Sequence, residues 1–222
     1  MSKLVIFDMD GTICDSWAGM SFCYRRTLDK FGRADIADEE YYSCFSGCLP
    51  ENLSKMLNVE GGELEEAVKY FRECYESEER CKAMLFPYIL DIIVNLHNEG
   101  YKIGLATMTL EKYAIDTLSH AGIVEYFDVI KGSDEKMRIS KTDMINACME
   151  ETGISKEDTV MVGDGFSDRS AAQNTGIGFI AAAYGYGITL DNCREYGIEN
   201  AASPRLVYDA IKKHWDRSVN IQ

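Results

Sequence analysis

The sequence predicts an α/β protein with a doubly wound parallel sheet and an α-helical domain inserted near the N-terminus. Three observations support this fold class. A short apolar run, Leu4 to Phe7, leads straight into acids and a glycine, as a buried strand of a parallel sheet does. Residues from about 14 to 84 show helical periodicity. Predicted helices and strands then alternate from Pro87 onward, which is typical of a parallel sheet with helices on both faces.

The composition is that of an ordinary soluble globular protein, with 222 residues, 46% of them apolar and 27% charged. No stretch is long and apolar enough to span a membrane. No basic region or cleavage site precedes the first strand, so we expect no secretory leader and a cytoplasmic protein. The eight cysteines lack zinc-ligand spacing and are expected to be reduced thiols. The net charge of −14 argues against nucleic-acid binding.

The N-terminal strand ends in two acids, Asp8 and Asp10, followed by Gly11. Alternate residues of a strand face the same side, so both carboxylates leave the strand tip together. Two carboxylates this close repel each other unless a positive group lies beside them. The pattern therefore favours a functional acid pair. The alternative is a turn that happens to be acidic, since aspartate is common in turns.

The inserted segment is predicted to be helical, because apolar residues recur in it at helical spacing. Helices are expected at residues 17–28, 51–57 and 63–80. Pro50 suits the first turn of the second helix, and Gly32 can end the first. We find no strand in this segment. The predicted domains are a helical domain of residues 15–84 and a sheet domain of residues 1–14 and 85–222.

The rest of the chain is predicted to alternate between helices and strands. Helices are expected at residues 87–98, 110–120, 141–151, 167–174 and 204–215. Strands are expected at residues 101–106, 127–131, 159–162 and 177–182. Sheets of this kind bind ligands outside the carboxyl ends of their strands. The residues that follow each strand are therefore the candidate site.

Two of these strand ends carry residues suited to a phosphate or metal site. Thr107 and Met108 follow one strand, where a hydroxyl and a backbone N–H can bind a phosphate oxygen. Taken alone, Thr107 fits a helix N-cap better than a ligand. Asp164 and Asp168 follow another strand, and Mg²⁺ prefers oxygen ligands such as carboxylates. Taken alone, Asp168 also fits an acid that stabilises a helix start.

Together these motifs resemble the haloacid dehalogenase (HAD) superfamily. Asp8-x-Asp10-Gly-Thr is similar to its first motif, and Gly-Asp164-x-x-x-Asp168 to its fourth. The resemblance covers the whole chain and implies a Rossmann-like core with an inserted helical C1 cap. In the family's phosphohydrolases the first acid, here Asp8, is the nucleophile and the second, Asp10, a general acid/base. Mg²⁺ would be bound by Asp8, Asp10, Asp164 and Asp168.

The family's second and third motifs stabilise the phosphoryl oxygens. Thr107-Met108 resembles the second motif, with Met108 contributing only its backbone N–H. Lys141 resembles the third. A basic residue near a helix start works against the helix dipole, which favours a function for it. The family often has Lys-Pro here, whereas this chain has Lys141-Thr-Asp, so Lys136 and Arg138 stay open as alternatives.

The resemblance implies a phosphatase that hydrolyses a small phosphomonoester through an aspartyl-phosphate on Asp8. The family's dehalogenases lack the second acid in this role, so Asp10 favours phosphoryl chemistry. Residues 183–187 and 45–50 are similar to segments of phosphoglycolate phosphatases and related 5′-nucleotidase-like members. A phosphoglycolate-like or nucleotide-like substrate is therefore expected.

Three other functions stay open. A phosphomutase resembling β-phosphoglucomutase would share the core and the cap. A receiver-like signalling module also uses clustered acids, a threonine, a lysine and an aspartyl-phosphate. Its phosphorylated acid follows a middle strand, however, and it carries no cap. A catalytically silent binding protein fits poorly with a chain in which every motif acid is present.

Discrimination between substrates is expected from the cap, because the strand ends can recognise a phosphoryl group but little else. In a chain this acidic, cap residues that meet an anionic substrate should be basic. Arg25 and Arg26, on the first predicted helix, are the candidates. A solvated basic helix face explains each arginine equally well. The expected partner is a small phosphorylated metabolite, with no nucleic acid or membrane, and the expected assembly a monomer or homodimer.

Overall fold

The computed structural model describes residues 2–44, 49–76, 83–135 and 138–219. The chain divides into two compact units. The core unit comprises residues 1–15 and 85–222, and the helical unit comprises residues 16–84. Among the described residues, no helix is long and apolar enough to cross a membrane.

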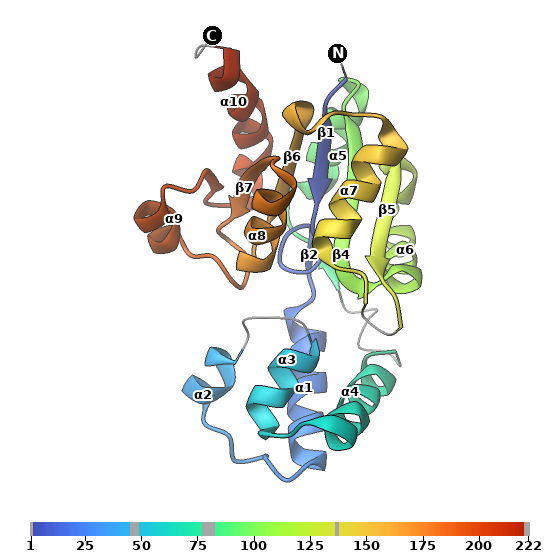
Figure 1. Ribbon diagram of the computed structural model, residues 1–222, viewed down its shortest axis with the longest axis vertical. Helices are drawn as coiled ribbons and strands as arrows, with labels where there is room; N and C mark the ends of the chain where they lie inside the picture. The colour runs from blue at the N-terminus through green and yellow to red at the C-terminus, as the bar shows by residue number, and fades with distance from the viewer. Residues whose placement is uncertain (1, 45–48, 77–82, 136–137, 220–222) are drawn as a thin grey trace. The chain divides into compact units, whose positions relative to one another are not determined.

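The core unit is built on a parallel sheet. Its strands in the described chain are β1 (Leu4–Phe7), β4 (Lys102–Leu110), β5 (Val129–Ser133), β6 (Thr159–Gly163), β7 (Gly178–Ala182) and β8 (Asn200–Ala201). Their order is β5-β4-β1-β6-β7-β8, and neighbouring strands pair in parallel. The fully buried β1 lies between β4 and β6 (Figure 1). This arrangement confirms the predicted α/β fold class.

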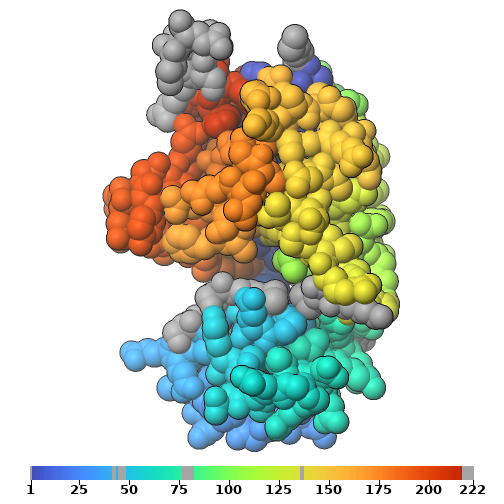
Figure 2. All heavy atoms as spheres, in the orientation of Figure 1, coloured from blue at the N-terminus to red at the C-terminus, as the bar shows by residue number. Residues whose placement is uncertain are grey.

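Helices cover both faces of this sheet. They are α5 (Ile89–Asn98), α6 (Glu111–His120), α7 (Lys141–Thr152), α8 (Phe166–Thr175), α9 (Leu190–Tyr196) and α10 (Val207–Val219). On one face, α7 and α8 bury Met144, Ile145 and Ala172 against β1 and its neighbours, and Figure 2 shows the side chains of these two helices meeting. On the other face, α5 packs against β4 and α10 against β7. These helices cover the faces of the sheet, so the residues that directly follow the strands lie at its carboxyl edge.

The helical unit has its own apolar core. It contains α1 (Trp17–Lys30), α2 (Asp38–Ser43), α3 (Leu49–Leu57) and α4 (Gly61–Glu76). Tyr24 on α1 and Phe71 on α4 are buried, with ring centroids 4.6 Å apart, and Leu53 and Met56 of α3 are fully buried in the same cluster. Burial of these side chains is the main source of stability for such a bundle.

Several elements differ from the sequence-based expectation. The helix α2, with three acids in its first turn, is too short to show apolar periodicity, and the same holds for α9. The expectation of no strand in the insertion is wrong at its boundaries. There β2 (Cys14–Asp15) and β3 (Met84–Leu85) form a two-stranded sheet, each too short to show alternation. β8 is equally short. Residues 45–48 and 77–80, which carry two further expectations, lie outside the described residues.

Candidate active site

The ends of β1 and β6 bring the first and fourth motifs together. Phe7 pairs with Val162, and the Asp8 backbone N–H donates to the Val162 carbonyl over 2.9 Å. Two parallel neighbours in this register place Asp8 and Asp164 side by side. Asp168, in the first turn of α8, is buried beside them. Ligand oxygens of these three acids lie within 4.8 Å of one another.

Lys141 reaches this acid cluster from the first turn of α7. Ser140 caps that helix, and its side chain accepts from the Asp143 backbone N–H. The Lys141 Nζ lies 3.0 Å from Asp8 Oδ2 and also forms a short ion pair with Asp168 Oδ1. The structure therefore brings the predicted third-motif lysine to the predicted nucleophile.

The two alternative bases have different positions. Arg138 is exposed and pairs with Asp134 through its Nε, 3.4 Å from the carboxylate. Lys136 lies outside the described residues. Of the two described candidates, Lys141 is therefore the one in contact with the acids.

The cluster carries more negative charge than its lysine balances. Burial raises the pKa of the Asp8 carboxyl well above its usual range, although Lys141 lowers it in part. Burial, reinforced by Asp168, raises the pKa of Asp164 to about 7. Burial alone would lower the pKa of Lys141, yet the two carboxylates raise it above its usual range. A bound cation would relieve the remaining repulsion.

The donor set of the cluster fits Mg²⁺. All three acids offer hard carboxylate oxygens, the ligand type that Mg²⁺ takes. The group of three does not include Asp10, so Asp10 as a metal ligand stays a prediction. The Asp10 carboxylate is contacted instead by Thr109, whose hydroxyl donates to Oδ2 over 2.6 Å. The other oxygen, Oδ1, is buried and accepts no hydrogen bond from the described residues.

Thr107 and Met108 follow the expected strand but differ in their contacts. Thr107 is fully buried, and its hydroxyl accepts from the Thr109 backbone N–H over 3.2 Å. A hydroxyl that accepts one hydrogen bond can still donate its proton to a phosphate oxygen. The Met108 side chain packs against the apolar cluster that the sheet forms with α7 and α8. Any contribution of Met108 to phosphate binding would therefore come from its backbone, as expected.

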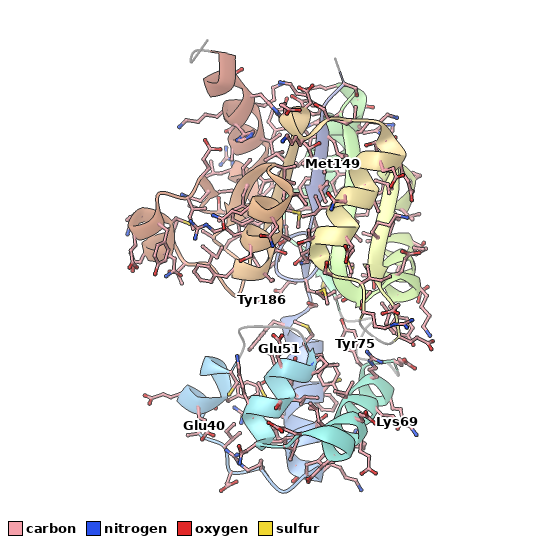
Figure 3. The ribbon with its side chains drawn as sticks, in the orientation of Figure 1. Glu40, Glu51, Lys69, Tyr75, Met149 and Tyr186 are labelled. Carbon is pink, nitrogen blue, oxygen red and sulfur yellow. The ribbon has the colours of Figure 1, made fainter. Side chains whose placement is uncertain are left out.

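The loop after β7 supports Asp164 in a way that the sequence did not reveal. The Tyr186 backbone N–H donates to Asp164 Oδ2 over 2.7 Å, and Figure 3 shows Tyr186 near the ends of the strands. A side chain at Gly185 would collide with Asp164 and with the Gly11 carbonyl. The Tyr184 hydroxyl donates to the Thr12 carbonyl over 2.7 Å. Gly185 thus allows the loop to pack closely against Asp164, a role that goes further than forming a turn.

A family model supports the same assignment over most of the chain. The model of the haloacid dehalogenase-like hydrolases matches residues 5–182. The chain belongs to this family. The family predicted from the sequence motifs is therefore confirmed. The HAD match runs from the first strand through β7 and so includes the residues of all four motifs, from Asp8 to Asp168.

Individual relatives carry two kinds of name. The tyrosine-protein kinase PtkA of Mycobacterium tuberculosis is 31% identical over 186 residues, which are 83% of this chain. The chain spans only 63% of the length of that relative. A phosphoglycolate phosphatase of Vibrio vulnificus is 28% identical over 224 residues, covering 96% of this chain and 95% of that protein.

Solved structures share the fold. A predicted phosphatase from Clostridium acetobutylicum superposes with a TM-score of 0.87 at 23% identity, covering 96% of this chain and 99% of the other. The structure of PtkA from Mycobacterium tuberculosis gives a TM-score of 0.78 at 28% identity, covering 96% of this chain and 97% of the other. The HAD core and its helical insertion are therefore common to these proteins.

In this HAD chain, the two cap arginines have contacts within the helical unit. The Arg25 guanidinium lies 2.5 Å from Asp38 Oδ1 and 3.9 Å from the centroid of the Tyr41 ring. Arg26 is exposed, with its guanidinium 5.7 Å from the centroid of the Phe22 ring. A role for Arg25 and Arg26 in binding substrate stays a prediction.

Proposed function

We propose that the chain is a Mg²⁺-dependent phosphatase that hydrolyses a small phosphomonoester through an aspartyl-phosphate on Asp8. The observation that carries the proposal is the Lys141 ammonium in contact with Asp8 inside the buried acid cluster. The hydrolase family and the relatives named phosphatases together indicate a phosphatase enzyme.

Asp8 would act as the nucleophile. Its carboxylate would attack the phosphorus while the bond from phosphorus to the leaving oxygen breaks, which divides a difficult hydrolysis into two steps. Lys141 keeps a positive charge beside the attacking group. Mg²⁺, bound by Asp8, Asp164 and Asp168, would supply further positive charge against the repulsion between a phosphate and a carboxylate.

Asp10 would move the protons of both steps. As a carboxylic acid it would protonate the leaving alkoxide, and as a carboxylate it would take a proton from the water that attacks the phosphorus. The second attack breaks the bond between phosphorus and Asp8, releasing phosphate and restoring the nucleophile. Thr107 and Lys141 would donate hydrogen bonds to the phosphoryl oxygens as charge moves onto them.

The substrate class is proposed from the relatives and the sequence. Relatives of this length are named phosphoglycolate phosphatase, and residues 183–187 resemble the same subgroup. A phosphoglycolate-like or nucleotide-like phosphomonoester is therefore the proposed substrate. A cytoplasmic location and a monomer or homodimer stay predictions.

A panel of phosphorylated metabolites, assayed with Mg²⁺ beside the Asp8→Asn variant, tests the proposal. We expect released phosphate from at least one small phosphomonoester, and a loss of at least about 10⁴-fold in Asp8→Asn, since an amide cannot act as this nucleophile. An isomeric sugar phosphate in place of free phosphate would indicate the phosphomutase. Equal turnover by both proteins would contradict the proposed chemistry.

A further inference from the structure

The end of strand β4 has an irregularity beside the candidate active site. Thr107 pairs with Gly132 of β5, but Leu110 pairs with Ser133. Two residues, Met108 and Thr109, are therefore inserted on β4 between consecutive partners on β5. Bulges of this kind occur next to active sites, where they redirect a side chain. The redirected side chain here is that of Thr109, which contacts Asp10.

The neighbouring residues accommodate this bulge. A side chain at Gly132 would collide with the Glu111 backbone and lie 2.8 Å from the Thr109 carbonyl oxygen. The Gly132 backbone N–H donates to Glu111 Oε2 over 3.3 Å, and the Thr109 N–H donates to Thr107. The position of the Thr109 hydroxyl is therefore determined by the backbone of both strands.

We propose that Thr109 is a positioning residue that aligns the Asp10 carboxyl group for both proton transfers. Among the described residues, its hydroxyl is the hydrogen-bond donor to that carboxyl, with 2.6 Å between Oγ1 and Oδ2. Oδ1 accepts no hydrogen bond from them. Oδ2 is thus held by Thr109, and the part of the chain that the structure describes offers no second donor to orient the carboxyl group. This inference rests on the proposed function, because it assigns Thr109 a role through Asp10.

Thr109 keeps its own proton in both half-reactions. In the first, the Asp10 proton passes to the leaving oxygen as the bond from phosphorus to that oxygen breaks. In the second, a water proton passes to Asp10 as the water oxygen bonds to phosphorus and the bond to Asp8 breaks. A threonine hydroxyl can donate to Oδ2 in both states of Asp10, since this carboxyl oxygen remains an acceptor.

The test compares kcat/KM for two substrates with different leaving groups. It separates the loss of a correctly positioned acid from a general disruption of the site. β-Glycerophosphate expels an alkoxide that needs a proton, whereas p-nitrophenyl phosphate expels a stable phenolate. In Thr109→Val we expect kcat/KM to fall about 10- to 100-fold for β-glycerophosphate, a part of the usual general-acid effect. For p-nitrophenyl phosphate we expect a change of less than about threefold, together with a burst of p-nitrophenolate, since the second step still needs Asp10 as base.

Two further variants serve as controls. Thr109→Ser keeps the hydroxyl. It should therefore hydrolyse β-glycerophosphate with a kcat/KM close to that of the wild type, and it should show no burst with p-nitrophenyl phosphate. Thr159→Val removes a hydroxyl that donates to the Ser155 carbonyl over 2.8 Å at the other end of β6. This variant should hydrolyse both substrates with wild-type kcat/KM. That result would show that the loss of a strand hydroxyl does not by itself lower activity toward β-glycerophosphate.

The outcomes are distinguishable from failure of the proposed function. If the wild type, with Mg²⁺, hydrolyses neither substrate, the proposed function fails and this inference fails with it. If the wild type is active and Asp8→Asn is not, equal kinetics in Thr109→Val and the wild type overturn the role of Thr109 alone. An equal loss for both substrates, without rescue by serine, would also overturn it and indicate a purely structural residue.

Discussion

In the core unit, the Lys141 side chain is 7% exposed and contacts two buried carboxylates, whereas in the helical unit the Arg25 side chain is 37% exposed and pairs with Asp38. A surface pair of the second kind contributes about 0–1 kcal/mol to stability. Burying a charge costs several kcal/mol of desolvation free energy, and the attraction to its partner does not always compensate for that cost. Buried charges in the core unit are therefore better explained by function than by stability.

The same contrast appears in the glycines. Gly185 in the core unit lies so close to Asp164 that a side chain would collide with it, whereas a Cβ added at Gly62 in the helical unit would meet open space beside its own helix. In the core unit, the backbone therefore packs tightly around a few buried carboxyl groups. In the helical unit, stability comes from ordinary apolar packing. Matched variants in the two units test this difference.

Removal of the lysine should have the largest effect of these variants. In Lys141→Met the cluster loses its ammonium, so we expect kcat/KM to fall about 10²- to 10³-fold. The free energy of unfolding should also fall by about 3–5 kcal/mol, because the buried carboxyl groups of Asp8 and Asp168 lose their ion-pair partner. Arg138→Met is the matched control at an exposed pair, and urea unfolding should show a change below about 1 kcal/mol. Similar kinetics in the two variants would contradict the account.

Loss of a metal ligand should come next. Asp164→Ala removes one of three clustered carboxylates, so the Mg²⁺ concentration for half-maximal activity should rise at least about tenfold. Titration of activity with Mg²⁺ after removal of metal with EDTA measures this. Wild-type activity that persists in excess EDTA would exclude the metal site, and an unchanged Mg²⁺ requirement would exclude Asp164 from it.

The glycine comparison predicts a smaller effect on stability. Gly185→Ala should lower the free energy of unfolding by about 1–3 kcal/mol, since the added methyl group displaces Asp164 or Gly11, and it should weaken Mg²⁺ activation. Gly62→Ala should leave stability unchanged or raise it by about 0.5–1 kcal/mol, because alanine favours a helix. Thermal and urea unfolding of both variants measure the difference. Equal stability would mean that the loop after β7 does not constrain Asp164.

The smallest effect concerns the cap arginines. Arg25→Ala or Arg26→Ala should raise KM severalfold, about the effect of one exposed charge, for the best anionic substrate of the panel. Hydrolysis of p-nitrophenyl phosphate should be unaffected, because the generic ester offers the cap no second anionic group. Steady-state kinetics on both substrates decide this. An unchanged KM in both single variants would remove these residues from substrate binding.

The sequence predicted those parts of the site that lie directly at strand ends. Asp8 and Asp164 each follow an apolar run, and a parallel sheet brings such ends together. The choice of Lys141 over Arg138 needed the structure, because both lie near the start of the same helix. The structure shows that Lys141 is buried against Asp8, whereas Arg138 is exposed and pairs with Asp134. Thr109 was missed, since a bulge is a property of pairing between β4 and β5 and has no sequence period.

Short elements were missed for a related reason. The helix α9 has seven residues, too few to show apolar periodicity, although its Thr189 cap and Gly197 end are recognisable afterwards. The support of Asp164 by Tyr186 comes from a backbone N–H, which every residue but proline offers. No side-chain pattern could therefore have identified it.

Covalent labelling of Asp8 tests the central claim most directly. The Asp10→Asn variant should accumulate the aspartyl-phosphate, because it lacks the base for the second step. It would be mixed with p-nitrophenyl phosphate and Mg²⁺, quenched in acid and analysed by peptide mass spectrometry. We expect a phosphoryl group on Asp8 and none in the double variant that also carries Asp8→Asn. A phosphoryl group on another residue, or rapid release of phosphate without any label, would contradict it.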